Sequence, residues 1–151
     1  KENFRLDAAH YDILTLNSAS IPGLDFISTG GSLDRIAKTK TIADYDPAYK
    51  YLNVCVTAVE NDSTCFKCVR TMLTLDALGK LDKFSAVFDV QYYMNHRKKY
   101  IERMYADGKF GNDESLLLLF PLFKSELTIR VKISAIIHKV QNAVRCRIFK
   151  R

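Results

Sequence analysis

The chain has 151 residues, of which 48% are hydrophobic and 26% are charged, and it contains four cysteines. One domain is the default at this length and a real core is possible; the composition is that of a soluble globular chain, and four cysteines are too few for a disulfide scaffold. The longest apolar run, residues 116–123, is too short to cross a bilayer, and no signal peptide is present, so we expect a cytoplasmic protein. Because the first residue is Lys1 rather than Met, we also expect the chain to be cut from a longer protein.

The net charge of +6 is concentrated at the C-terminal end. Residues 124–151 hold eight basic side chains and one acidic one, which gives this segment +7 and leaves −1 for the remainder. The positive field therefore belongs to the C-terminal segment alone.

Strand and helix signals alternate in the first third of the chain. Residues 24–27 predict a short strand, the apolar spacing of Leu33, Ile36 and Ala37 predicts a helix, and residues 49–57 alternate like a second strand. Strand, helix and strand in this order predict one right-handed crossover between parallel strands. The predicted fold class is therefore α/β, with a short parallel βαβ unit in the N-terminal third and a mainly helical region after it.

The turn at residues 28–34 contains a glycine pair between the first predicted strand and the helix. A phosphate cradle has this position. However, no serine follows Asp34, and a plain turn in which Ser32 caps the helix is the better interpretation.

Helical signals dominate after residue 65. We expect helices at residues 66–78, with Gly79 as a left-handed C-cap, at about residues 85–106, ended by Asp107 and Gly108, and at residues 114–120. A last helix is predicted from apolar residues at steps of three and four between Ile129 and Ile148. We predict two domains, residues 1–82 with the cysteine motif and residues 83–151 as a helical extension.

Three of the four cysteines fall within residues 55–68. Cys65 and Cys68 form a C-x-x-C pair at the start of a predicted helix, and Cys55 ends a predicted strand. Thiolates are good zinc ligands, a carboxylate oxygen can also bind zinc, and Asp62 lies three residues before Cys65. Cys55, Asp62, Cys65 and Cys68 are therefore candidate ligands of a structural zinc ion.

Two other interpretations of the C-x-x-C pair stay open. Cys65 and Cys68 can be free or oxidised thiols packed at a helix start, without a metal. They can also form a redox pair, because a helix N-terminus lowers a cysteine pKa, although such a pair normally follows the first strand of a thioredoxin-like unit.

The residues around the cysteines resemble a known family. Tyr51 to Cys55, followed by Cys65 to Leu81, and the upstream segment Gly31 to Thr39 resemble the N-type ATP pyrophosphatase superfamily, also called the adenine nucleotide alpha-hydrolase-like or HUP superfamily. The cysteine arrangement is similar to the zinc-binding end of 7-cyano-7-deazaguanine synthases. The similarity covers about residues 7–82 and is specific only around the cysteines.

The chain departs from the family in two ways. Asp62 stands where the family has the first cysteine of a triple motif, and the ATP-binding loop Ser-Gly-Gly-x-Asp-Ser is absent. The resemblance implies the C-terminal part of an adenylating or amidating protein that uses ATP and a small-molecule substrate bound by its N-terminal part. Within such a fold Lys38 and Arg70 are the candidate phosphate contacts, and the alternative for both is a salt bridge or a solvated side chain.

The basic C-terminal helix, within residues 124–151, has three interpretations. It can pack on the core as a surface helix, attach to an anionic membrane surface, or contact nucleic acid. Nucleic acid is the weakest of these, because only Phe149 interleaves an aromatic ring with the basic residues.

Two function classes follow. The chain is the C-terminal portion of an ATP pyrophosphatase-like protein that does not catalyse alone, or it is a non-enzymatic interaction module with a metal or thiol staple and a basic docking helix. The sequence leaves the choice between an enzyme and a module open.

Overall fold

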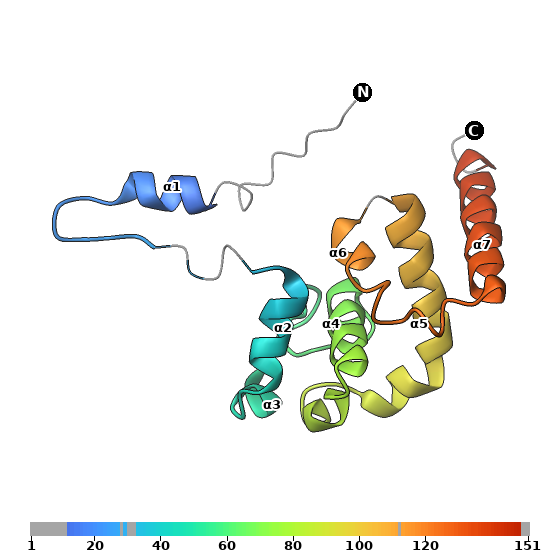
Figure 1. The fold of residues 1–151 in the computed structure, drawn as a ribbon, viewed down its shortest axis with the longest axis horizontal. Coiled ribbons are helices and arrows are strands. Elements are labelled where there is room, and N and C mark those ends of the chain that lie inside the picture. Colours follow the sequence, from blue (N-terminus) through green and yellow to red (C-terminus); the bar gives the residue numbers. More distant parts are fainter. Residues whose placement is uncertain (1–11, 28, 30–32, 112, 149–151) are drawn as a thin grey trace. The chain divides into compact units, whose positions relative to one another are not determined.

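The computed structural model describes residues 12–27, 29, 33–111 and 113–148 of the chain. The chain divides into two compact units, residues 1–34 and residues 35–151. The first unit contains helix α1 (Asp12–Ala19). The second contains the 3₁₀-helix η2 (Leu81–Phe84) and the helices α2 (Arg35–Ala43), α3 (Ala48–Tyr51), α4 (Phe66–Ala77), α5 (Val90–Gly111), α6 (Glu114–Leu117) and α7 (Ile129–Ile148) (Figure 1).

The predicted βαβ unit is wrong, because the described residues contain no β-strand and are mainly helical. Residues 24–27 contribute only an isolated antiparallel bridge between Ile21 and Leu24 across a turn in which Gly23 has a φ of +86°. The predicted strand at residues 49–57 begins inside α3 and continues as irregular chain. Pro47, in a helical conformation before α3, favours the helix start.

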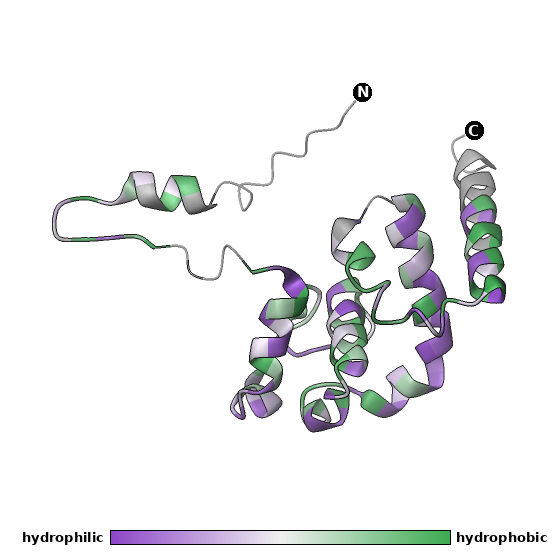
Figure 2. Cartoon of the chain, in the orientation of Figure 1, coloured by the Kyte–Doolittle hydropathy of each residue, from purple (hydrophilic) through white to green (hydrophobic). Residues whose placement is uncertain are grey.

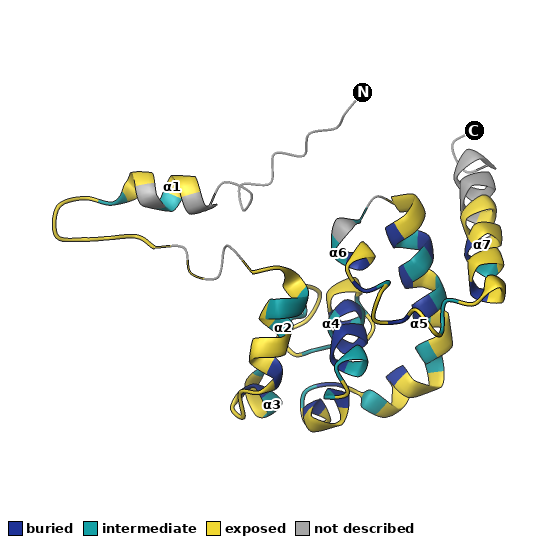
Figure 3. Ribbon diagram, viewed as in Figure 1, coloured by how far each residue is buried: buried dark blue, intermediate teal, exposed yellow. Residues whose placement is uncertain are grey.

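Helix α4 is the centre of the second unit. It packs against α2 and α5, and α5 in turn packs against α6 and α7. Burial is concentrated on α4 and on the segments that face it (Figure 3). The largest fully buried side chains are Tyr93, Phe84, Phe123, Met72, Leu73, Leu75 and Leu119.

The predicted C-terminus of α4 is confirmed. Gly79 has a φ of +65°, which favours glycine, and its N–H donates to the Asp76 carbonyl at 2.9 Å. The Lys80 N–H donates to the Leu75 carbonyl, also at 2.9 Å. This pair of bonds is a Schellman motif, and it reverses the chain into η2.

Helix α5 differs from its prediction at both ends. It starts at Val90, because Asp89 Oδ1 accepts from the Tyr92 N–H at 2.8 Å and so caps the helix there. Asp107 and Gly108 do not end it. A Cβ on Gly108 would lie 3.0 Å from the Phe120 ring, so this glycine provides a close approach inside the helix.

Helix α6 ends at Leu117 rather than at Phe120, and α7 spans the predicted range. On α7, Val131 and Ala135 are buried. Other apolar side chains of α7 are exposed, and Figures 2 and 3 show apolar colour on exposed parts of this helix. The exposed ones are Ile129, Ile133, Ile136, Ile137 and Val140.

No helix of the described residues has the length and hydrophobicity needed to cross a membrane. The predicted division of the chain between residues 82 and 83 stays a prediction. The turn at residues 28–34, with its Ser32 cap, lies largely outside the described residues.

Candidate metal centre

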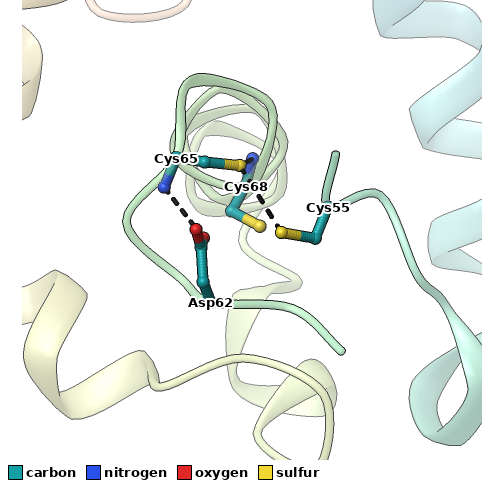
Figure 4. Close-up of side chains that lie close together, drawn as sticks. All are labelled: Cys55, Asp62, Cys65 and Cys68. Carbon is teal, nitrogen blue, oxygen red and sulfur yellow. Dashed lines mark hydrogen bonds between the residues drawn. The ribbon is translucent and has the colours of Figure 1, made fainter. Parts of the chain in front are cut away.

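The four candidate ligands come together in one place. Cys55 lies in the irregular segment after α3, Asp62 lies in the turn before α4, Cys65 is the N-cap of α4, and Cys68 lies in its first turn. One ligand atom from each residue lies within 4.8 Å of every other (Figure 4). The cysteine and aspartate spacing therefore predicted a real spatial cluster that could hold a metal ion.

The start of α4 places two of the sulfur atoms. Cys65 has extended backbone angles, and its Sγ accepts a hydrogen bond from the Cys68 N–H at 3.4 Å. An N-cap side chain and the residue three positions later face each other at a helix start. A C-x-x-C pair at this point therefore directs both sulfur atoms to one side of the helix end.

The turn that leads into α4 is fixed by Ser63. This residue has a φ of +56° and is 4% exposed, and its Oγ accepts from the Asp89 N–H at 2.8 Å. The left-handed region is strained for a residue with a Cβ. The hydrogen bond holds this turn against the start of α5.

The Asp62 carboxylate is held by three donors. Its Oδ1 accepts from the N–H groups of Thr64 and Cys65, both at 2.9 Å, and its Oδ2 accepts from the Thr57 hydroxyl at 2.6 Å. These bonds, with the Thr57 hydroxyl as the largest cause, lower the pKa of Asp62 well below its ordinary value. The group is therefore an anion at neutral pH and retains lone pairs for a cation.

Cys55 closes the cluster from the opposite side. Its Sγ lies 3.9 Å from Cys65 Sγ and 3.1 Å from the Thr57 Oγ1. The Thr57 hydroxyl has one proton, which can be donated either to Asp62 Oδ2 or to Cys55 Sγ. Its hydrogen bond with Cys55, followed by hydrogen bonding from the Asp62 backbone, lowers the pKa of the Cys55 thiol to about 6. This residue is therefore the cysteine most ready to bind a metal as a thiolate.

The pKa of the Cys68 thiol is shifted in the opposite direction. Its side chain is fully buried, and this burial, followed by the hydrogen bond with Cys65, raises the pKa of the Cys68 thiol well above its ordinary value. Without a cation the buried thiol stays protonated. A metal ion would supply the positive charge that makes a thiolate favourable at this position.

The sequence did not predict the role of Asn61, whose side chain bonds the backbone of the segments on either side of the cluster. Its Oδ1 accepts from the N–H groups of Val54 and Cys55 at 2.9 and 3.2 Å. Its Nδ2 donates to the carbonyl groups of Leu52 and Val87 at 2.8 and 3.1 Å. One amide thereby joins the segment that carries Cys55 to the chain just before α5. The run of turn-forming residues at 61–64 is the only sequence signal for it.

The donor set fits a tetrahedral zinc ion. Two thiolates that share a zinc at about 2.3 Å each lie about 3.8 Å apart, which matches the observed 3.9 Å between the sulfur atoms of Cys55 and Cys65. The largest ligand separation of 4.8 Å requires a contraction of about 1 Å. Rotation of a side chain is sufficient for a change of this size.

The two predicted phosphate contacts, Lys38 and Arg70, have different surroundings. Lys38 is exposed on α2, beside a groove formed with Arg35, Thr39 and Val54. Arg70 is buried on α4, where its Nη1 donates to Ser115 Oγ at 2.9 Å. They line different cavities, and their role as phosphate contacts stays a prediction.

Comparison with known proteins adds no family. No protein-family model matches the chain, and no curated protein and no solved structure is significantly similar to it. The resemblance to the ATP pyrophosphatase superfamily therefore stays a prediction from the motif residues.

Proposed function

We propose that the chain is a helical interaction module held together by a structural zinc ion at Cys55, Asp62, Cys65 and Cys68. The observation that carries the proposal is the convergence of four ligand atoms within 4.8 Å of one another. Three of these residues lie in a segment without regular secondary structure, and such a segment has few other means of holding its conformation.

The chemistry of the donors supports zinc. Thiolates are soft ligands that select zinc, copper(I) or iron over magnesium and calcium, and a carboxylate oxygen is a known fourth ligand for zinc. Four protein donors complete a tetrahedron and leave no position for a substrate, which supports a structural role over a catalytic one.

The ion would join three parts of the second unit. Cys55 belongs to the chain after α3, Cys65 and Cys68 belong to α4, and the turn between them is bonded to the start of α5 through Ser63 and Asn61. A single ion at this junction would fix α3, α4 and α5 relative to one another. The basic helix α7, packed on α5, would then be presented on a rigid support.

An enzymatic role as part of an ATP pyrophosphatase-like protein stays a prediction. In that role the phosphate-binding loop would belong to the N-terminal part that the resemblance implies, and the described residues contribute no parallel sheet to it. The module is the simpler function for the residues that are present.

The test is the metal content of protein purified without chelators or metal-affinity resin. We expect about one zinc ion per chain by elemental analysis, and loss of the ion together with a lower unfolding temperature in Cys65→Ser. Cys146→Ser is the matched control. It removes the fourth cysteine, which lies in α7 away from the cluster, and it should keep both the metal and the stability.

The opposite result is equally clear. If the wild-type chain contains no metal, cannot be loaded with Zn²⁺ under reducing conditions, and unfolds at the same temperature with and without Zn²⁺, the proposal of a structural zinc ion is wrong. Thiol titration then separates free thiols from a Cys65–Cys68 disulfide.

A further inference from the structure

Arg70 is a buried arginine with an incomplete set of partners. Its side chain belongs to α4, the residue is 9% exposed, and its Nη1 donates a hydrogen bond to Ser115 Oγ at 2.9 Å. Its Nε is buried and has no hydrogen-bond partner. Among the carboxylates whose side chains the structure describes, none lies within ion-pair distance of this guanidinium.

Arg97 in the same protein is an arginine that is paired with two carboxylates. Its side chain is more exposed, at 27%, yet its Nε donates to Asp76 Oδ2 at 2.7 Å and its Nη2 donates to Glu126 Oε1 at 2.8 Å. Its Nη1 also donates to Glu126. The more exposed arginine thus has two carboxylates, whereas the more buried one has a single hydroxyl group. Burial of a charge without a counter-charge is costly.

The free edge of Arg70 is the one that binds anions best. Nη1 is occupied by Ser115, whose hydroxyl donates in turn to Asp113 Oδ1 at 2.5 Å. Nε has no acceptor among the described residues, and Nη2 lies beside it on the same edge of the guanidinium. These two N–H groups are parallel and form the fork that pairs with two oxygen atoms of a carboxylate or a phosphate.

A cavity lies in front of this guanidinium. Its walls include Phe66, Arg70, Tyr100, Arg103 and Met104, and its volume is about 20 Å³. This space is sufficient for one water-sized atom, such as one oxygen of an anionic group. The Phe66 ring lies 4.8 Å from the guanidinium carbon of Arg70 and supports it from one side.

The surroundings of the cavity are cationic. Arg103 contributes a second guanidinium. Its Nε lies 3.3 Å from Asp107 Oδ2, which is a long contact for an ion pair. Burial, followed by the charge of Arg35, lowers the pKa of Arg70. The walls of the cavity therefore carry two guanidinium groups, those of Arg70 and Arg103, and one carboxylate, that of Asp107.

We propose that Arg70 and Arg103 form a binding site for an oxyanion, a carboxylate or a phosphate group, that occupies the cavity beside Phe66. One oxygen would enter the cavity and accept from Arg70 Nε and Nη2, and the rest of the group would lie at the opening beside Arg103. None of the proposed metal ligands lines this cavity.

The test is NMR spectroscopy of the ¹⁵N-labelled chain, observing the arginine Nε–H signals during titration with inorganic phosphate, with acetate, and with chloride at equal ionic strength. We expect a saturable shift of the Arg70 signal with phosphate or with acetate, and the one that binds more tightly identifies the class of anion. The Arg97 signal is the internal control, because its Nε–H is already bonded to Asp76.

Variants make the site assignment specific. Arg103→Gln changes a largely exposed side chain and should leave the fold intact while weakening the shift of the Arg70 signal at least threefold in dissociation constant. Arg130→Gln, on α7, removes a positive charge away from the cavity and should change nothing. No shift of the Arg70 signal with either anion, or an equal shift with chloride, would overturn the proposal.

Discussion

Asp62 Oδ1 accepts a hydrogen bond of 2.9 Å from the backbone N–H of Cys65, the residue that caps α4. The acidic member of the cluster is therefore a local structural element as well as a candidate ligand. The two roles use different properties of the carboxylate. The hydrogen bond needs an oxygen acceptor, whereas the metal needs a negative charge.

Asp62→Asn separates these roles, and we expect it to weaken zinc binding without unfolding the metal-free chain. The amide oxygen can still accept from the Cys65 and Thr64 N–H groups, but it is neutral and a poor zinc ligand. Asp62→Ala is the comparison, because it loses the hydrogen bonds too and should cost about 1 kcal/mol of metal-free stability. Chelator competition measures the affinity, and urea unfolding in chelator measures the stability. A wild-type affinity in Asp62→Asn would show that Asp62 is not a ligand.

Zinc binding should strengthen as the pH rises from about 6 to about 8. The pKa of Cys55 is lowered to about 6, so this thiol is largely ionised at neutral pH, whereas the raised pKa of Cys68 keeps its proton in place. The metal must displace that proton, and each displaced proton changes the apparent affinity by about tenfold per pH unit. Chelator competition at three pH values measures the slope, which should be smaller in Cys68→Ser. An affinity independent of pH would contradict thiolate ligation by Cys68.

The features that could be predicted from the sequence depend on short-range signals. Gly79 ends α4 through two backbone bonds within six residues, and the C-x-x-C pair needs only the geometry of one helix start. The apolar repeat of α7 is equally local. These predictions are confirmed because the residues that decide them are neighbours in the chain.

The predicted strands failed because strand formation needs a partner. The N–H groups of Val54 and Cys55 donate to the side chain of Asn61 instead of to another strand. Alternating β-forming residues indicate a surface that fits a sheet, but they do not supply the second strand. The role of Asn61 was equally hidden, because its bond to Val87 joins residues 26 positions apart.

Asn61→Ala should destabilise the chain by about 2 kcal/mol or more, because it removes one side chain that satisfies four backbone groups. Urea unfolding with and without Zn²⁺ measures the change. Asn53→Ala is the matched control: this exposed side chain also bonds the Cys55 N–H, but water can replace it. Equal effects of the two substitutions would refute the special role of Asn61.

Membrane contact through residues 124–151 stays a prediction, and α7 offers residues with which to test it. Ile133 and Ile137 are one turn apart and about half exposed, and the basic residue Lys132 lies on the same helix, whereas Lys139 Nζ donates to the Phe110 carbonyl of α5 at 2.6 Å. An exposed apolar stripe beside basic side chains favours an anionic lipid surface. We expect sedimentation with vesicles that contain phosphatidylserine but not with neutral vesicles, and loss of binding in Ile133→Ser/Ile137→Ser. A dimer in solution that does not bind either vesicle would assign the stripe to a second copy of the chain.

Substitution of Gly108 tests the close approach between α5 and the segment after α6. In most helix interiors glycine to alanine stabilises by about 0.5 to 1 kcal/mol. At this position the new Cβ would lie 3.0 Å from the Phe120 ring and 3.3 Å from the Leu116 Cβ, so we expect Gly108→Ala to destabilise instead, by about 1 to 3 kcal/mol. Gly111→Ala is the control at the end of the same helix, where the nearest atom is the Asp107 Cβ at an ordinary 3.9 Å.

Urea unfolding of the two alanine variants measures the difference in sign. Phe120→Leu should restore part of the stability of Gly108→Ala, because a smaller side chain makes room for the added methyl group. The rescue depends on contact between these two residues, so a general loss of stability would not produce it. If Gly108→Ala is as stable as Gly111→Ala, the Phe120 ring does not pack closely on the helix at this glycine.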